Sequence, residues 1–158
     1  MSQAALGPAR CLAFAASALV AGILCCGCGV ASATEYRSVG PDPAILYDAP
    51  TNRGRKLFVA PRGMPLEVVV VQQDWIRVRD QSGDLSWVEK KSLSDKRTLV
   101  TVNATAAHSG PDDSTPIVFR IQPGVVLDLL DPPSNGYVHV RHRDAVSGWI
   151  PLGDLWGS

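Results

Sequence analysis

Cysteine is missing from most of the chain. All 4 cysteines precede Gly29, so the remainder can form no disulfide, no cysteine-ligated zinc site and no thiolate nucleophile. A helical pattern is missing as well, because no window after residue 33 places apolar residues at the 3.6-residue spacing of an amphipathic helix with caps. These absences exclude cysteine chemistry and helical folds, and they favour a fold built from short strands.

An excess of positive charge is also missing. Removing Arg10 from the 15 Lys+Arg leaves 14 after residue 33, against 15 Asp+Glu, a net charge of −1. This balance argues against a nucleic-acid partner, which requires a basic surface. The charge is divided unevenly, with 11 basic and 9 acidic residues in 34–97 (+2) and 3 basic and 6 acidic in 98–158 (−3). Neutral divergence of solvated faces and pairing between opposite faces are both compatible with this division.

The first 33 residues have the composition of a secretory signal. A short start with one basic residue, Arg10, is followed by the apolar or small run 11–30 and by Ala31-Ser32-Ala33, an A-x-A cleavage pattern. We therefore expect residues 1–33 to be a signal peptide and the protein to be exported. Two alternatives stay open: the run is long enough for an uncleaved membrane anchor, and Gly27-Cys28 offers a lipid attachment point.

The rest of the chain repeats itself at an offset of 61 to 62 residues. Phe58–Val68 matches Phe119–Leu129, and Trp75–Arg79 matches Tyr137–Arg141. A repeat of about 60 residues is long enough for a small domain with its own core. We expect two modules, 34–97 and 98–158, held close together by the short linker Ser94-Asp95-Lys96-Arg97.

Each module contains several short apolar runs separated by turn residues. The expected strands are 57–60, 66–71, 75–79 and 85–88 in the first module and 98–102, 117–121, 125–130, 137–141 and 148–150 in the second. Turns are expected at 62–63, 80–84, 122–124, 131–136 and 142–147, and single helical turns at 90–93 and 151–155. Strands of this length and spacing predict an all-β chain of two small antiparallel barrels.

The order of the motifs within each module resembles the bacterial SH3-like domain family. The matching segments are Arg62–Val68, Asp74–Val78 and Ser86–Val88 in the first copy and Pro123–Leu129, Gly136–Val140 and Gly148–Ile150 in the second. The resemblance covers about residues 45–155. It departs from the family pattern at Ser86, where a glycine is usual, and at Gln122, where a basic residue is usual. It implies two tandem SH3-like barrels in an exported, periplasmic protein of a Gram-negative bacterium.

The resemblance also implies ligand grooves between loops, where aromatic side chains are the candidates. Tyr47 stands in Ile45-Leu46-Tyr47-Asp48, which is similar to the Ala-Leu-Tyr-Asp run of the peptide groove in eukaryotic SH3 domains. Trp75 and Tyr137 begin matching strands and share a strand face with Arg77 and His139 respectively. These five residues are the expected ligand contacts. The alternative for Trp75 and Tyr137 is that each covers one end of a barrel core.

Two other features receive structural interpretations. We expect Trp87 and Trp149 to be core residues, one large aromatic in each barrel. The basic run Arg53-Gly54-Arg55-Lys56 is expected to be a solvated loop, although it is also suited to an anionic partner.

No enzyme motif is found. The three histidines, 108, 139 and 142, do not converge on a metal site, and no nucleophile motif accompanies them. We therefore expect no catalytic residue, no metal and no cofactor. The predicted function is non-enzymatic recognition in the cell envelope, of peptidoglycan or of extended peptides, with no membrane span after residue 33. The alternative is an assembly protein that binds an envelope protein without a wall ligand. Oligomeric state and the identity of the ligand are open.

Overall fold

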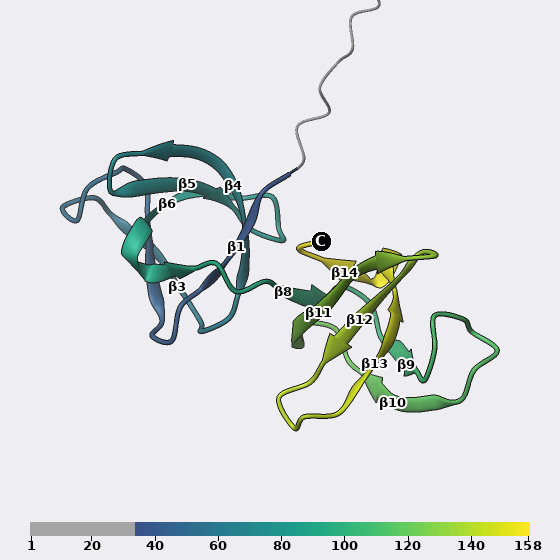
Figure 1. Ribbon diagram of the computed structural model, residues 1–158. Coiled ribbons are helices and arrows are strands. Elements are labelled where there is room, and N and C mark those ends of the chain that lie inside the picture. The colour runs from purple at the N-terminus through teal and green to yellow at the C-terminus, as the bar shows by residue number, and fades with distance from the viewer. Residues whose placement is uncertain (1–33) are drawn as a thin grey trace, which may run out of the picture. The chain divides into compact units, whose positions relative to one another are not determined.

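The computed structural model describes residues 34–158 and folds them into strands and two short 3₁₀ turns (Figure 1). The first barrel contains β1 (Tyr36–Val39), β2 (Ala44–Tyr47), β3 (Lys56–Ala60), β4 (Pro65–Gln72), β5 (Trp75–Arg79), β6 (Leu85–Glu89), η1 (Lys90–Ser92) and β7 (Leu93–Ser94). The second contains β8 (Thr98–Thr101), β9 (Thr105–His108), β10 (Ile117–Ile121), β11 (Val126–Ser134), β12 (Tyr137–Arg141), β13 (Ser147–Pro151), η2 (Leu152–Asp154) and β14 (Leu155–Trp156). The signal-peptide prediction and its two alternatives fall on residues 1–33, outside the described residues. Within the described part, no helix is long and apolar enough to cross a bilayer.

The two sheets have the same topology. Each has seven strands, in the orders β3-β2-β6-β5-β4-β1-β7 and β10-β9-β13-β12-β11-β8-β14. Every pairing is antiparallel, and each strand of the first order corresponds to the strand seven places later in the second. The all-β prediction and the prediction of two tandem barrels are therefore confirmed.

The core of each barrel is aliphatic. The first consists of Val39, Ala44, Leu46, Ala60, Leu66, Ile76, Val78 and Val88, and the second of Leu99, Ala107, Ile121, Leu127, Val138, Val140, Ile150 and Leu155. On β5 and β12 the buried residues alternate with partly exposed ones, as the period of two predicts.

The prediction that Trp87 and Trp149 are core residues is wrong. Both are only half-buried, and their neighbours on either side along β6 and β13 are the buried ones. Trp87 pairs with Arg77 on the outer face of its barrel, and Trp149 pairs with His139. The core positions of both barrels are taken by aliphatic side chains, and the two tryptophan rings lie outside them.

One predicted turn is also wrong. Residues 131–136 carry the turn residues Pro132, Pro133, Asn135 and Gly136, yet β11 continues through Ser134. Its register against β12 shifts twice, between Leu129 and Asp131 and between Asp131 and Ser134. Prolines are compatible with a strand at such irregularities, where ladder hydrogen bonds are already interrupted. The turn itself shrinks to Asn135 and Gly136, both with positive φ.

The described residues, 34–158, belong to one compact unit, and specific contacts join its two barrels. Thr98 is 3% exposed, and its hydroxyl donates a hydrogen bond of 2.6 Å to the carbonyl oxygen of Gly63. The Tyr36 ring lies edge-on to Trp156 with 5.3 Å between centroids. These contacts agree with the expectation that the short linker keeps the modules together.

Candidate ligand-binding groove

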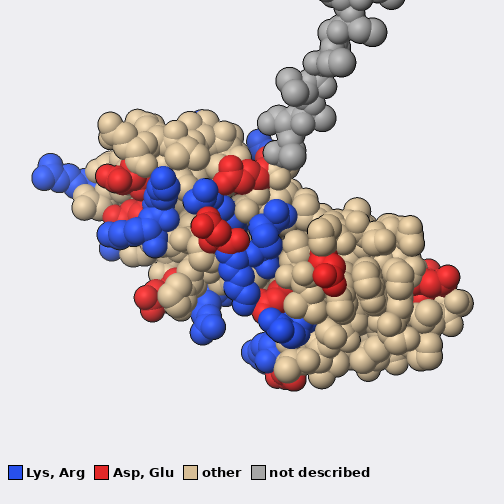
Figure 2. Space-filling model, viewed as in Figure 1, with Lys and Arg blue, Asp and Glu red and all other residues tan. Residues whose placement is uncertain are grey.

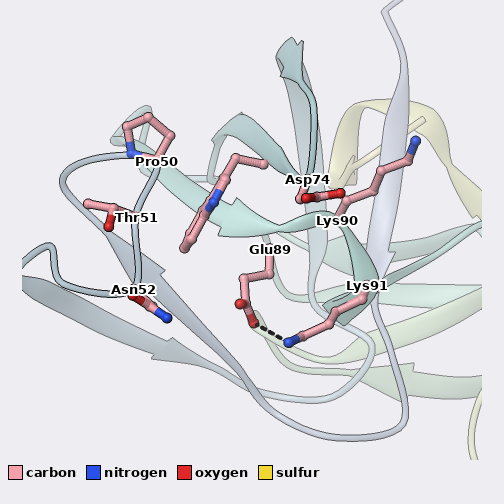
Figure 3. Close-up of a pocket in the computed structure, with 8 residues that line it drawn as sticks. Pro50, Thr51, Asn52, Asp74, Glu89, Lys90 and Lys91 are labelled. Atoms are coloured by element: carbon pink, nitrogen blue, oxygen red, sulfur yellow. Dashed lines mark ion pairs between the residues drawn. The ribbon is translucent and has the colours of Figure 1, made fainter.

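The first barrel has a groove of about 570 Å³ beside Trp75. Its other lining residues come from the loop after β2, from the β4–β5 turn and from the β6–η1 junction: Pro50, Thr51, Asn52, Asp74, Glu89, Lys90 and Lys91. Figure 3 shows Pro50, Thr51 and Asn52 on one side of this groove and Asp74, Glu89 and the two lysines across from them. An aromatic floor between two polar walls suits an extended ligand that stacks on a ring and is oriented by charges.

Two of the five predicted ligand contacts meet in this barrel. The Tyr47 ring lies edge-on to Trp75, with 5.4 Å between centroids and 86° between planes. Tyr47 is only 7% exposed, whereas Trp75 is half-buried and lines the groove. Trp75 is therefore placed to contact a ligand, and Tyr47 supports it from beneath. The Tyr47 ring is buried and lies behind the groove lining, so its assignment as a ligand contact stays a prediction.

The loop that forms one wall is held in shape by Asp48. Its carboxylate accepts a hydrogen bond of 2.8 Å from the backbone N–H of Arg55 and forms an ion pair of 3.6 Å with the Arg55 side chain. Gly54 approaches so closely that a Cβ there would lie 2.9 Å from Asp48 Oδ1 and 3.1 Å from the Thr51 carbonyl oxygen. The loop is thus closed on itself across its base, which positions Pro50, Thr51 and Asn52.

The opposite wall carries charges of both signs. Glu89 faces Trp75 across the β5–β6 pair and forms an ion pair of 3.2 Å with Lys91. The backbone N–H of Lys90 donates to the carbonyl oxygen of Asp74 at 2.8 Å, which brings η1 against the β4–β5 turn. The wall therefore offers carboxylates to a ligand amine and ammonium groups to a ligand carboxylate within one groove.

The equivalent aromatic of the second barrel is engaged by its own loop. The Asp113 carboxylate lies near the Tyr137 hydroxyl, and this interaction raises the pKa of Tyr137 above its usual value of 10.0. The Asp113 Oδ1 atom also lies 3.8 Å from Nε2 of His108, which is the counterpart of Tyr47. Further along the loop, the Ser114 N–H donates to Asp112 at 2.7 Å and lowers the pKa of that carboxyl. Tyr137 is thus less available to a ligand than Trp75.

Arg77 and His139 occupy matching positions on the outer sheet face. Arg77 pairs with Trp87 on the neighbouring strand and is not among the residues that line the Trp75 groove. His139 stacks on Trp149 at 4.7 Å with 10° between planes, and its Nδ1 lies 2.6 Å from Asp131. Neither side chain joins the candidate groove, so the sequence-based assignment of these two as ligand contacts stays a prediction.

Several groove residues were missed by the sequence analysis. The strands at 75–79 and 85–88 and the turn at 80–84 were predicted, and the observed register between these strands places Glu89 opposite Trp75. Lys90 and Lys91 follow directly, so this wall could have been inferred. Thr51 and Asn52 carry no comparable signal, because their position depends on the fold of the loop. Among residues 34–158, no group of three or more histidine, aspartate or glutamate side chains is arranged to hold a metal.

The chain belongs to the bacterial SH3 domain family, whose model matches it twice, over residues 40–95 and 101–157. The resemblance inferred from the motifs is thereby confirmed. No curated protein matches the chain at a significant level.

Solved structures that match part of the chain include two proteins from Trichomonas vaginalis and one from Bacillus cereus. NlpC2 of T. vaginalis is 15% identical, with a TM-score of 0.38, over 79% of this chain and 48% of that protein. NlpC1 is 16% identical, with a TM-score of 0.38, over 79% and 46%. An NlpC/P60 family protein from B. cereus is 14% identical, with a TM-score of 0.34, over 77% and 56%. This chain therefore spans about half the length of the solved proteins it resembles.

Proposed function

We propose that this protein is an exported, non-enzymatic binding protein that uses the Trp75 groove to recognise peptidoglycan or an extended peptide in the cell envelope. The observation that carries the proposal is the half-buried Trp75 between a polar loop and a wall with charges of both signs. Peptidoglycan stem peptides and other short peptides present amines, carboxylates and extended backbone together, which is the chemistry this groove would accommodate. Family membership supports a binding role, since bacterial SH3 domains often bind the cell wall.

The binding mechanism follows from the geometry of the groove. A peptide backbone or sugar face stacks on the Trp75 indole, which is supported by Tyr47. Asp74 and Glu89 attract an ammonium group, and Lys90 and Lys91 attract a carboxylate. Such a shallow site binds weakly when alone, and a second site in the same chain would raise the overall affinity.

Co-sedimentation with purified peptidoglycan sacculi tests the proposal. Residues 34–158 should pellet with sacculi at tens of micromolar protein, and Trp75→Ala should reduce the pelleted fraction several-fold while circular dichroism shows an intact fold. Tyr137→Ala is the matched variant in the second barrel and should have the smaller effect, because Asp113 already engages Tyr137. If the parent protein stays in solution, wall recognition is ruled out. Cell fractionation with detection of the processed amino terminus tests the export to the periplasm.

A second candidate function is assembly with an envelope protein through a surface other than the groove. It is favoured by the uneven charge of the two barrels, about +2 and −3. On the face shown in Figure 2, Lys and Arg gather over the first barrel, whereas the second barrel is mostly uncharged. Crosslinking in envelope fractions would identify such a partner.

A further inference from the structure

Strand β3 is an edge strand with an unusual surface. It pairs with β2 alone, at the end of its sheet, so one row of its backbone groups has no strand partner. Three consecutive apolar side chains on it are exposed: Leu57 by 45%, Phe58 by 52% and Val59 by 58%. Edge strands in monomeric proteins are usually protected by charge, by bulges or by a covering loop, because a long apolar edge pairs readily with another chain.

The second barrel does not leave its matching phenylalanine uncovered. Phe119 on β10 is partly buried and packs against the core, and its ring lies 6.4 Å from that of His142. Its partner across the strand pair is Ala107, and Gly148 leaves the remaining space: a Cβ at Gly148 would lie 2.9 Å from Ala107 Cβ and 3.4 Å from the Phe119 ring. The ring fits inward because both neighbours are small.

In the first barrel both of these neighbours are larger. The residue opposite Phe58 is Leu46, which is 2% exposed, and the residue that corresponds to Gly148 is Ser86, which is 7% exposed. Phe58 is on the same strand face as Ala60, which is fully buried, so the ring starts on the core side. Leu46 and Ser86 are larger than their counterparts Ala107 and Gly148, so less inward space is left for a ring in the first barrel, and the Phe58 ring is exposed.

The surroundings of β3 are basic. Arg53, Arg55, Lys56 and Arg62 are all exposed and lie within or beside the β2–β3 hairpin. Of these four side chains, only Arg55 forms an ion pair with another of residues 34–158, at 3.6 Å from Asp48. The edge therefore combines an apolar strip with unpaired positive charge at both of its ends.

We propose that β3 is a docking edge for an extended segment of a partner protein in which apolar and acidic residues alternate. The segment adds a strand beside β3, and its backbone satisfies the open row of hydrogen-bonding groups. Its apolar side chains cover Leu57 and Val59 on one face of β3. On the other face its acidic side chains lay their aliphatic stems on Phe58, and their carboxylates reach Lys56 and Arg62. Charge complementarity selects this occupant, because two copies of this chain joined through β3 would bring their basic groups together. No residue of β3 lines the Trp75 groove.

Fluorescence anisotropy tests the proposal with residues 34–158 and a labelled peptide of about eight residues that alternates valine and glutamate. We expect saturable binding that weakens with added salt, and binding at least about tenfold weaker for the peptide that alternates valine and lysine. Lys56→Glu combined with Arg62→Glu should lower the affinity for the glutamate peptide at least about fivefold. Lys56, Arg62 and Phe58 are all exposed. The double charge reversal and the separate variant Phe58→Ser should therefore fold normally.

Ser86→Gly provides a variant that leaves β3 itself unchanged. It opens space beneath Phe58, so the ring should turn inward as Phe119 does, and the affinity for the glutamate peptide should fall by about as much as in Phe58→Ser. Equal binding of the two peptides, or unchanged affinity after the double charge reversal, would overturn the proposal. Loss of binding in Trp75→Ala would assign the peptide to the groove and overturn it as well. Self-association of the parent that Phe58→Ser abolishes, measured by analytical ultracentrifugation, would assign the edge to a second copy.

Discussion

Tyr47 lies beneath Trp75 in an edge-to-face arrangement, with 5.4 Å between ring centroids. Tyr47 is nearly buried, and its strand β2 also pairs with Trp87 of β6. The ring that meets the groove thus rests on a residue anchored in the barrel wall. This arrangement gives a ligand-facing aromatic a fixed orientation before any ligand arrives, which lowers the entropic cost of binding.

A double-mutant cycle between Tyr47 and Trp75 measures this contact. Each residue is replaced by leucine, alone and together, and the free energy of unfolding is obtained from urea titrations followed by circular dichroism. We expect a coupling energy of about 1 kcal/mol, as for other edge-to-face pairs. A cycle between Tyr47 and Trp149 should give no coupling, because these residues belong to different barrels. A coupling energy near zero for the first pair would contradict the proposed support.

Gly54→Ala tests how the groove wall is held. The added Cβ would lie 2.9 Å from Asp48 Oδ1, so the carboxylate must move and its hydrogen bond to the Arg55 N–H must weaken. We expect a loss of about 1–3 kcal/mol in the free energy of unfolding and weaker sacculus binding. Gly153→Ala is the control, since nothing lies within 4 Å of the added atom. Equal stability of the two variants would show that the loop adapts without cost.

Gly148→Ser places the first barrel's residue in the second. Its Cβ would meet Ala107 and the Phe119 ring, so either the ring is expelled or the core is strained. We expect a loss of about 1–3 kcal/mol and, in a crystal structure, a Phe119 as exposed as Phe58. An unchanged Phe119 position at unchanged stability would refute the explanation given for the exposed phenylalanine.

The titration of Tyr137 reports its contact with Asp113. The interaction with the Asp113 carboxylate raises the pKa of Tyr137, so the neutral phenol is favoured in the folded protein. This contribution to stability is complete below the usual tyrosine pKa and is lost as the pH rises through the raised value. Asp113→Ala should therefore lower the pKa of Tyr137 toward 10.0, as followed by ultraviolet difference spectra or NMR. Tyr36, whose raised pKa results chiefly from burial, is the internal reference and should not move.

The parts of the fold that depend on local pattern could be predicted from the sequence. Strands β5, β10 and β12 begin and end where the pattern of apolar residues indicated. The single helical turns η1 and η2 were also predicted. Strands β1 and β9 were not predicted. They are short and contain small or polar residues, such as Ser38 and Thr105, and they become strands only because β4 and β10 pair with them.

The candidate groove could be predicted only in part. Trp75 was identified because a large aromatic starts a strand on the face opposite the core residues. The different states of Trp75 and Tyr137 were not predictable, because the sequence does not reveal that Asp113 reaches the Tyr137 hydroxyl. The partnership of Tyr36 with Trp156 was also missed. These residues lie at opposite ends of the described chain, and neither belongs to a repeated motif.

Leu46 is larger than its counterpart Ala107, and Ser86 is larger than its counterpart Gly148. These differences in side-chain volume also affect how the chain folds. Two adjacent barrels with the same strand order risk exchanging equivalent strands as they fold, a common failure of tandem domains. If β9 and β10 entered the first barrel, the Phe119 ring would lose the space that Gly148 leaves open and would be exposed, as Phe58 is. In the reverse exchange, the Leu46 side chain would meet a site shaped for Ala107. Two small differences in side-chain size thus let each strand distinguish its own barrel from the neighbouring one.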